Sequence, residues 1–136
     1  KITKMCFENK DIPLYGSGEY IRDYVYIDDV INALLLISVK DYKEIRKSLN
    51  IVFNVSSGNG TFVKTIFKLI AKEVEKITNA KINIETVPWP SHVSEIEKRN
   101  FIGSAERLKS LTGWFAKTSI EEGVQLLVKK YSKDFM

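Results

Sequence analysis

The sequence predicts an α/β fold, and three local patterns indicate it. Residues 51–55 are a compact run that is apolar except for Asn54, which is typical of a strand buried on both faces of a parallel sheet. Residues 62–76 place apolar side chains at helical spacing, and residues 82–87 alternate as a half-exposed strand does. The chain of 136 residues has room for a single domain, residues 1–136, with a small core.

Local signals define the elements of the first part of the chain. Pro13 places its strand near a sheet edge, because proline has no N–H for a strand ladder. Asp28 and Asp29 precede an apolar helical pattern, and an acid at a helix start accepts free backbone N–H groups. The predicted elements are a helix end over residues 1–9, a strand over 10–15, a turn over 16–18, a strand over 23–27 and a helix over 28–38.

Capping signals mark the ends of the predicted helices in the second part of the chain. Thr61 is expected to cap a helix, and Gly113 to end another in the left-handed conformation with Trp114 packing back. Ser119 and Glu122 have the spacing of a capping box. The predicted elements are a charged loop over residues 41–50, a strand over 51–55, a turn over 56–60, a helix over 62–76, a strand over 82–87, an irregular segment over 88–92, an extended segment over 100–102, a helix after 104 and a last helix to residue 131.

Composition excludes several classes of function. The net charge is +4, but the lysines are scattered instead of clustered, which argues against a nucleic-acid partner. The longest apolar run, residues 33–37, is too short to cross a membrane. Cys6 is the single cysteine, which fits a cytoplasmic location and a small buried side chain instead of a nucleophile. His92 is the single histidine, so we expect no metal site.

The inward-facing apolar positions of these elements predict the core. It comprises Val30, Leu34, Ile37, Phe53, Val55, Ile66, Phe67, Ile70, Leu108, Leu111 and Trp114.

The stretch from Ile12 to Val30 carries the clearest sign of a ligand. Its glycines at 16 and 18 let the backbone turn and approach a ligand closely, and Arg22 offers a planar fork suited to phosphate. Taken alone, these residues leave two interpretations open. The stretch is a phosphate-facing turn, or it is a surface hairpin in which Arg22 pairs with Asp23 or Glu19.

The same stretch resembles a motif of the extended short-chain dehydrogenase/reductases, the NAD-dependent epimerases and dehydratases of nucleotide sugars. Their pattern is close to P-I/L-x-Y/F-G-x-G-x-x-x-R-D-F/Y/W-V/I-x-V-x-D. Three later segments are also similar to family motifs: residues 54–58, with Ser56 where glycine is commoner, residues 108–114 and residues 119–123. The matching positions of the first motif are Pro13, Tyr15, Gly16, Gly18, Arg22, Asp23, Tyr24, Val25, Ile27 and Asp29.

The resemblance implies that this chain is the C-terminal portion of such a Rossmann-type enzyme. We then expect a small mixed α/β substrate-binding domain with the last strand or strands of the sheet. The family's glycine-rich dinucleotide turn does not occur in the sequence, and no tyrosine has a lysine four residues later. We therefore expect no catalytic and no cofactor-binding residue in this chain, and NAD would be bound by the N-terminal part that the chain does not contain.

The resemblance also assigns site residues. Arg22 would bind the diphosphate of a nucleotide sugar, and Leu14 and Tyr15 would line its base. Trp89 and Asn59 would close over the ligand, although the loop around Trp89 lacks the arginine that many family members place there.

The whole enzyme implied by the resemblance is a cytoplasmic homodimer. It would be an epimerase similar to UDP-glucose 4-epimerase, or a 4,6-dehydratase, and would oxidise the sugar at C4 by hydride transfer to NAD. The alternative is a stand-alone module that binds nucleotides or proteins without catalysis.

Overall fold

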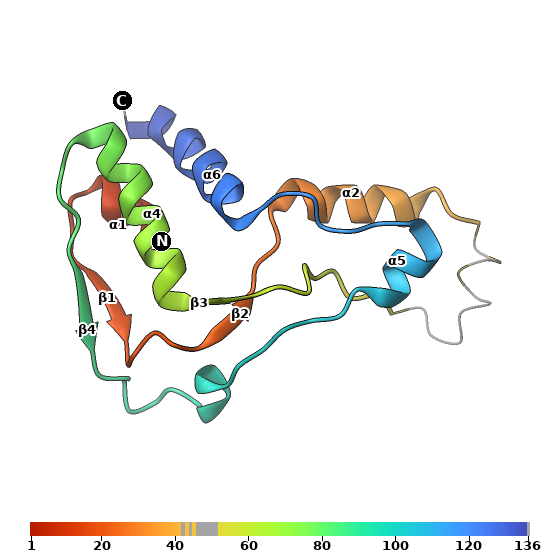
Figure 1. Cartoon of the computed structure of the whole chain (residues 1–136), viewed down its shortest axis with the longest axis horizontal. Helices are drawn as coiled ribbons and strands as arrows, with labels where there is room; N and C mark the ends of the chain where they lie inside the picture. The colour runs from red at the N-terminus through yellow and green to blue at the C-terminus, as the bar shows by residue number, and fades with distance from the viewer. Residues whose placement is uncertain (42, 44, 46–51, 136) are drawn as a thin grey trace. The chain divides into compact units, whose positions relative to one another are not determined.

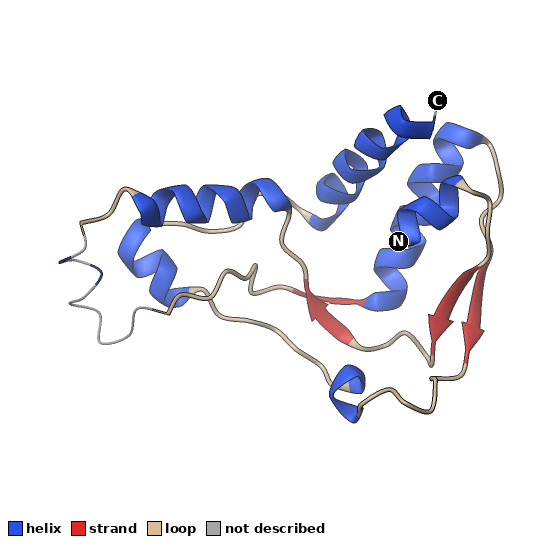
Figure 2. Ribbon diagram, turned by 180° about the vertical axis from the view of Figure 1, so that it is seen from behind, coloured by secondary structure: helices blue, strands red, loops and turns tan. Residues whose placement is uncertain are grey.

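The computed structural model describes residues 1–41, 43, 45 and 52–135, and its elements are shown in Figures 1 and 2. Most of the predicted loop over 41–50 and residue 51 of the predicted strand lie outside this range. The chain divides into two compact units. Unit 1 comprises Lys1–Arg22, Thr61–Asn100 and Glu121–Met136, and unit 2 comprises Asp23–Gly60 and Phe101–Ile120.

Unit 1 is built on two parallel strands, which lie side by side in Figure 2. They pair in the register Ile12 with Ile84, and helix α1 packs against helix α4. The side chains of Cys6, Ile12, Val74 and Val128 are almost completely buried. The elements of this unit are α1 (Ile2–Phe7), β1 (Ile12–Tyr15), α4 (Val63–Thr78), β4 (Ile84–Val87), the 3₁₀ helix η1 (Glu95–Lys98) and, apart from its first residue, α6 (Ile120–Phe135).

Helix α4 follows the predicted apolar stripe. Ile66, Ile70 and Val74 recur every fourth residue and are buried, and Phe67 is half-buried. The helix ends at Asn79, whose φ of 55° is left-handed. The predicted cap was wrong, because Phe62 occupies the N-cap position without a side-chain hydrogen bond and Thr61 lies in a strand instead.

Unit 2 has its core around Ala33, Leu108 and Trp114. Two helices supply these residues, α2 (Ile27–Ser38) and α5 (Glu106–Thr112). Gly113 ends α5 with φ 74° and donates its N–H to the Lys109 carbonyl, as the C′ signal predicted. Val30, Ile37, Phe53, Val55 and Leu111 of the predicted core are only half-buried.

One predicted core residue faces solvent. Leu34 is 59% exposed, because the buried side of α2 is made by Asp29 and Ala33. Asp29 also departs from its predicted role as a helix cap. Its Oδ2 accepts hydrogen bonds from the backbone N–H groups of Lys117 (3.2 Å) and Thr118 (2.9 Å), and the Trp114 indole N–H donates to its carbonyl (3.0 Å). It therefore ties α2 to the segment that follows α5.

Two of the predicted strands differ from the structure. The strand predicted over 23–27 is observed as β2 (Ile21–Asp23), which pairs with β3 (Gly60–Phe62). Residues 52–55 form no strand and pair with no other described segment, so the buried strand predicted there is not found in the described part of the chain. Among the described residues, no helix has the length and apolar character needed to cross a membrane.

Candidate functional site

Unit 1 contains a cavity of about 160 Å³, which we call the aromatic cavity. Its lining side chains come from the end of β1, the strand β2, the start of α4, the loop after β4 and η1. Four of the five residues predicted to bind substrate meet here. The lining residues are Leu14, Tyr15, Tyr20, Arg22, Val63, Phe67, Trp89 and Glu97.

The glycine turn after β1 makes room for Trp89 at this cavity. Gly16 has φ 61°, a conformation that costs other residues strain. A Cβ on Gly16 would lie 2.7 Å from Nε1 of Trp89 and 3.0 Å from the Tyr20 hydroxyl oxygen. The sequence therefore needs glycine at position 16 for conformation and for space.

Three aromatic rings form one side of the cavity. The ring of Trp89 stacks on Tyr15, with centroids 5.4 Å apart and an interplanar angle of 22°, and it meets Tyr20 edge-on at 5.5 Å. The Trp89 Nε1–H also donates to the Tyr20 hydroxyl at 3.0 Å. Sequence reasoning missed Tyr20, because nothing in the local pattern indicates a contact with a residue 69 positions away.

Arg22 is held at the cavity by backbone carbonyls. Its Nη1 donates to the carbonyls of Ile21 (2.9 Å) and Arg99, and its Nη2 donates to the carbonyl of Glu97. Three of the five guanidinium N–H groups are thus used, which leaves two for a ligand. Two N–H groups suffice for one bidentate contact with a phosphate.

The interpretation in which Arg22 pairs with Asp23 or Glu19 at the surface is wrong. Glu19 pairs with Lys64 at 2.5 Å, and the hydrogen bond from that lysine lowers the pKa of the Glu19 carboxyl. The carboxylate of Asp23 is engaged by another set of donors, the N–H groups of residues 57, 58 and 103 and the Ser57 hydroxyl. The orientation of Arg22 is therefore set by carbonyls and not by an ion pair.

Asn59 is not among the residues that line the aromatic cavity. It belongs to unit 2, where it is exposed and its Nδ2 donates to the Ser57 carbonyl at 3.4 Å. This contact is local to the turn over residues 57–59, and a role of Asn59 in ligand binding stays a prediction.

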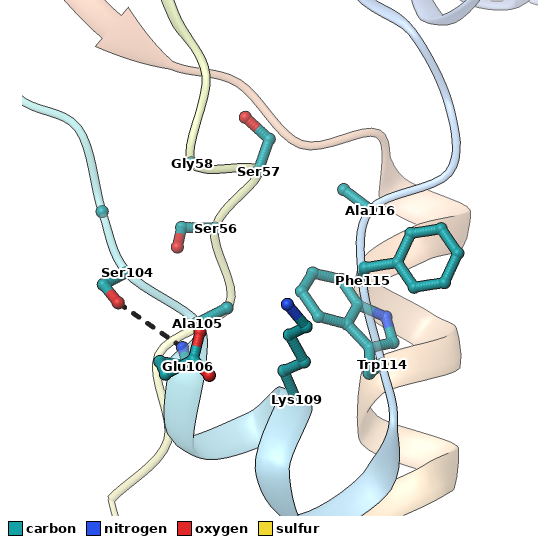
Figure 3. Close-up of a pocket in the computed structure, with 11 residues that line it drawn as sticks. Ser56, Ser57, Gly58, Ser104, Ala105, Glu106, Lys109, Trp114, Phe115 and Ala116 are labelled. Carbon is teal, nitrogen blue, oxygen red and sulfur yellow. Dashed lines mark hydrogen bonds between the residues drawn. The ribbon is translucent and has the colours of Figure 1, made fainter.

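A second cavity, of about 250 Å³, lies within unit 2 between the turn over 56–58 and helix α5 (Figure 3). In this view the Lys109 side chain extends into the cavity from α5. Trp114 and Phe115 lie on one side of it, and Ser56 and Ser104 lie on the other. None of the predicted site residues lines it. Ser56 fits beside it because residue 103 is glycine, where a Cβ would lie 2.6 Å from the Ser56 Cβ.

The remaining reactive side chains give no further centre in the described part of the chain. Cys6 is 1% exposed, and burial raises the pKa of its thiol to about 11, so it is a core residue as expected. His92 is exposed, and no three His, Cys, Asp or Glu side chains of the described residues gather as metal ligands would.

Comparisons with known proteins point to one family. Residues 1–127 match the model of the family described as GDP-mannose 4,6 dehydratase. The dTDP-glucose 4,6-dehydratase 1 of Escherichia coli is 28% identical over 93% of the chain, and the dTDP-D-glucose 4,6-dehydratase of Mus musculus is 25% identical over 99%. These matches cover 33% and 36% of the two relatives.

Solved structures agree with this assignment. The UDP-glucose 4-epimerase of Thermotoga maritima, solved with UDP-glucose, is 32% identical with a TM-score of 0.77, over 99% of this chain and 39% of the other. The dTDP-glucose 4,6-dehydratase of Bacillus anthracis, solved with NAD, has a TM-score of 0.72 at 23% identity and supports the fold alone, over 98% of this chain and 38% of the other.

The chain spans about a third of the length of the curated relatives that it matches. Its mixed α/β structure corresponds to the C-terminal part of the extended short-chain dehydrogenase/reductase fold, as the sequence motifs predicted. With its family model matched over residues 1–127, the chain belongs to the GDP-mannose 4,6 dehydratase family, within the NAD-dependent epimerases and dehydratases.

Proposed function

We propose that this chain is the substrate-binding portion of an NAD-dependent nucleotide-sugar epimerase or 4,6-dehydratase, similar to UDP-glucose 4-epimerase. The observation that carries the proposal is that Leu14, Tyr15, Arg22 and Trp89 line one cavity. The family relationship gives these residues a common ligand class, and the Thermotoga maritima epimerase was solved with UDP-glucose.

The size and chemistry of the aromatic cavity suit the base of the nucleotide. At about 160 Å³ it is smaller than the roughly 300–1,000 Å³ of pockets that enclose a whole drug-sized ligand. A flat base fits such a space, and its rings offer stacking partners with a favourable geometry. The sugar would then lie outside this cavity.

Arg22 would bind the diphosphate beside the base. Its two remaining N–H groups form charge-assisted hydrogen bonds to phosphate oxygens, and the carbonyls of residues 97 and 99 fix the guanidinium before the ligand arrives. Such preorganisation reduces the entropy lost when the ligand binds. Lysine at position 22 would keep the charge but lose the planar fork.

The chemical step would need groups that this chain lacks. The sequence contains no Y-x-x-x-K pair to act as the family's general base and no glycine-rich dinucleotide turn. We therefore assign NAD binding and hydride transfer to the N-terminal part of the fold. The dimer and the cytoplasmic location expected of the whole enzyme stay predictions.

Titration of the 136-residue chain with UDP-glucose tests the proposal. Binding should quench the fluorescence of Trp89, which lies in the cavity, and Trp89→Phe should remove that signal. We expect Arg22→Lys to weaken binding about ten- to hundredfold, because a hydrogen bond to a charged group contributes about 1.5–3 kcal/mol.

Arg107→Lys is the matched control, since Arg107 is exposed on α5 and lines no part of the aromatic cavity. Its affinity should equal that of the wild type. NAD should not saturate the chain in a parallel titration. Equal affinities of the wild type and Arg22→Ala, with both proteins folded by circular dichroism, would refute the role of Arg22.

A further inference from the structure

Trp89 is fixed in the lining of the aromatic cavity by its side chain and by its backbone. Its ring contacts those of Tyr15 and Tyr20 at centroid distances of 5.4 and 5.5 Å, and its Nε1–H donates to the Tyr20 hydroxyl at 3.0 Å. Pro88 and Pro90 flank it, and a proline fixes its own φ and restricts the residue before it to extended conformations. A displacement of Trp89 would therefore break several contacts, and its backbone has little freedom to follow.

The volume of the cavity matches a single aromatic ring. The cavity measures about 160 Å³. A buried apolar cavity of about 150 Å³ is large enough to bind one benzene molecule. A pyrimidine base has one six-membered ring, whereas a purine base has a second, fused ring that needs more room. Leu14 is 7% exposed and belongs to the core, so the cavity cannot easily widen on the side of Leu14 or of Trp89.

The Tyr20 hydroxyl gives the cavity a polar group that the ligand can use. A phenol hydroxyl has one proton to donate and two lone pairs that accept. The Trp89 indole donates to one lone pair, and no described residue accepts the proton of the hydroxyl. Every pyrimidine base has a carbonyl at C2, which can accept this proton, whereas adenine has no carbonyl group.

We propose that the aromatic cavity accepts a pyrimidine base and rejects a purine base, and that Trp89 sets this limit with Tyr20 as its positioning residue. The proposal rests on the proposed function and adds to it the class of the base. Membership of the family leaves that class open, because the family is described as GDP-mannose 4,6 dehydratase while the Escherichia coli relative is a dTDP-glucose 4,6-dehydratase. Guanine is a purine and thymine is a pyrimidine.

Calorimetric titration of the 136-residue chain with UDP-glucose and with GDP-glucose measures this preference. The two ligands share the sugar, the diphosphate and the ribose, and they differ only in the base. We expect the wild type to bind UDP-glucose at least about tenfold more tightly. GDP-glucose would have to displace Trp89, which costs the hydrogen bond to Tyr20 and the two ring contacts.

Two variants test the residues that set the limit. Trp89→Ala removes the ring that blocks a purine, so the preference for UDP-glucose should fall to about threefold or less. Tyr20→Phe keeps the ring and removes only the hydroxyl, so the fold should be retained. Without its hydrogen bond Trp89 can move, and we expect the preference to fall at least about twofold. A residue that only stabilised the fold would not change the ratio of the two affinities.

Two controls separate the base from the rest of the ligand. Tyr131 is a half-buried tyrosine of α6 in unit 1 that does not line the cavity, so Tyr131→Phe should leave both affinities unchanged. Arg22→Lys should weaken both ligands by the same factor, because the diphosphate is common to them, and the preference should stay as in the wild type.

The possible results distinguish a failure of base selection from a failure of the proposed function. Equal affinities of the wild type for the two ligands, or tighter binding of GDP-glucose, would overturn the pyrimidine preference and leave the proposed function in place. A wild-type preference in both Trp89→Ala and Tyr20→Phe, with both proteins folded by circular dichroism, would refute the role of Trp89. Binding of neither ligand would refute the proposed function and the base selection with it.

Discussion

Asp23 accepts four hydrogen bonds, and replacing it with asparagine should destabilise unit 2. Its Oδ1 accepts from the Ser57 N–H (2.8 Å) and hydroxyl (2.6 Å). Its Oδ2 accepts from the N–H groups of Gly58 (2.9 Å) and Gly103 (3.2 Å). The carboxylate therefore joins β2 to the turn over 56–58 and to the segment before α5.

The loss follows from the hydrogen-bond inventory. An asparagine keeps one acceptor oxygen and turns an NH₂ group toward donors that have no acceptor left. Two charge-assisted bonds of about 1.5–3 kcal/mol each are lost, and two others become neutral bonds of about 0.5–1.5 kcal/mol. Since Asp23 is half-buried and water can replace part of the loss, we expect Asp23→Asn to lower the free energy of unfolding by about 3 kcal/mol.

Urea unfolding of the chain measures this difference. Trp89→Phe as the common background leaves the buried Trp114 of unit 2 as the only tryptophan. Asp28→Asn is the matched control, because Asp28 is exposed in the first turn of α2, and its change should stay within about 0.5 kcal/mol. A loss below about 1 kcal/mol in Asp23→Asn, with an unchanged denaturant slope, would refute the four-bond argument.

Two further predictions rest on single positions. Gly16→Ala should weaken UDP-glucose binding roughly tenfold in the same titration, because the new Cβ would displace Trp89 from the cavity. Gly58→Ala, also at positive φ but with no atom within 4 Å of the new Cβ, should leave binding unchanged, and equal affinities of the two variants would contradict the packing argument. Burial raises the pKa of the Cys6 thiol from 9.0 to about 11, so the folded state favours the neutral form and its stabilisation is lost as the pH rises from about 9 to about 11. The free energy of unfolding of the wild type, measured with urea, should fall over this range by up to about 3 kcal/mol more than that of Cys6→Ala, and parallel pH profiles would contradict it.

The sequence alone determined the features that depend on neighbours within one helical turn or one hairpin. The stripe of Ile66, Ile70 and Val74 repeats at the spacing of a buried helix face, and Gly113 ends α5 in the left-handed conformation that glycine adopts without strain. The family motif around Arg22 also fixed the fold class. These signals are local, so a single sequence contains all of the information that they need.

Contacts between residues far apart in sequence were decided only by the tertiary structure. Tyr20 meets Trp89 across 69 positions, Asp23 reaches Gly103 across 80, and Asp29 binds the N–H of Thr118 across 89. Local reasoning placed Asp29 in a helix cap. An acid at a helix start has the same position in the sequence whether it caps that helix or binds N–H groups of a distant segment.

Leu34 shows the same limit for apolar residues. Helical periodicity identifies a stripe of apolar side chains, but α2 carries apolar residues on both sides. Which side is buried in this chain depends on Leu108 and Trp114, which arrive from a distant part of the sequence and pack against Ala33. The pattern of one helix thus gives its period, and the partner that the fold brings to it decides which face is buried.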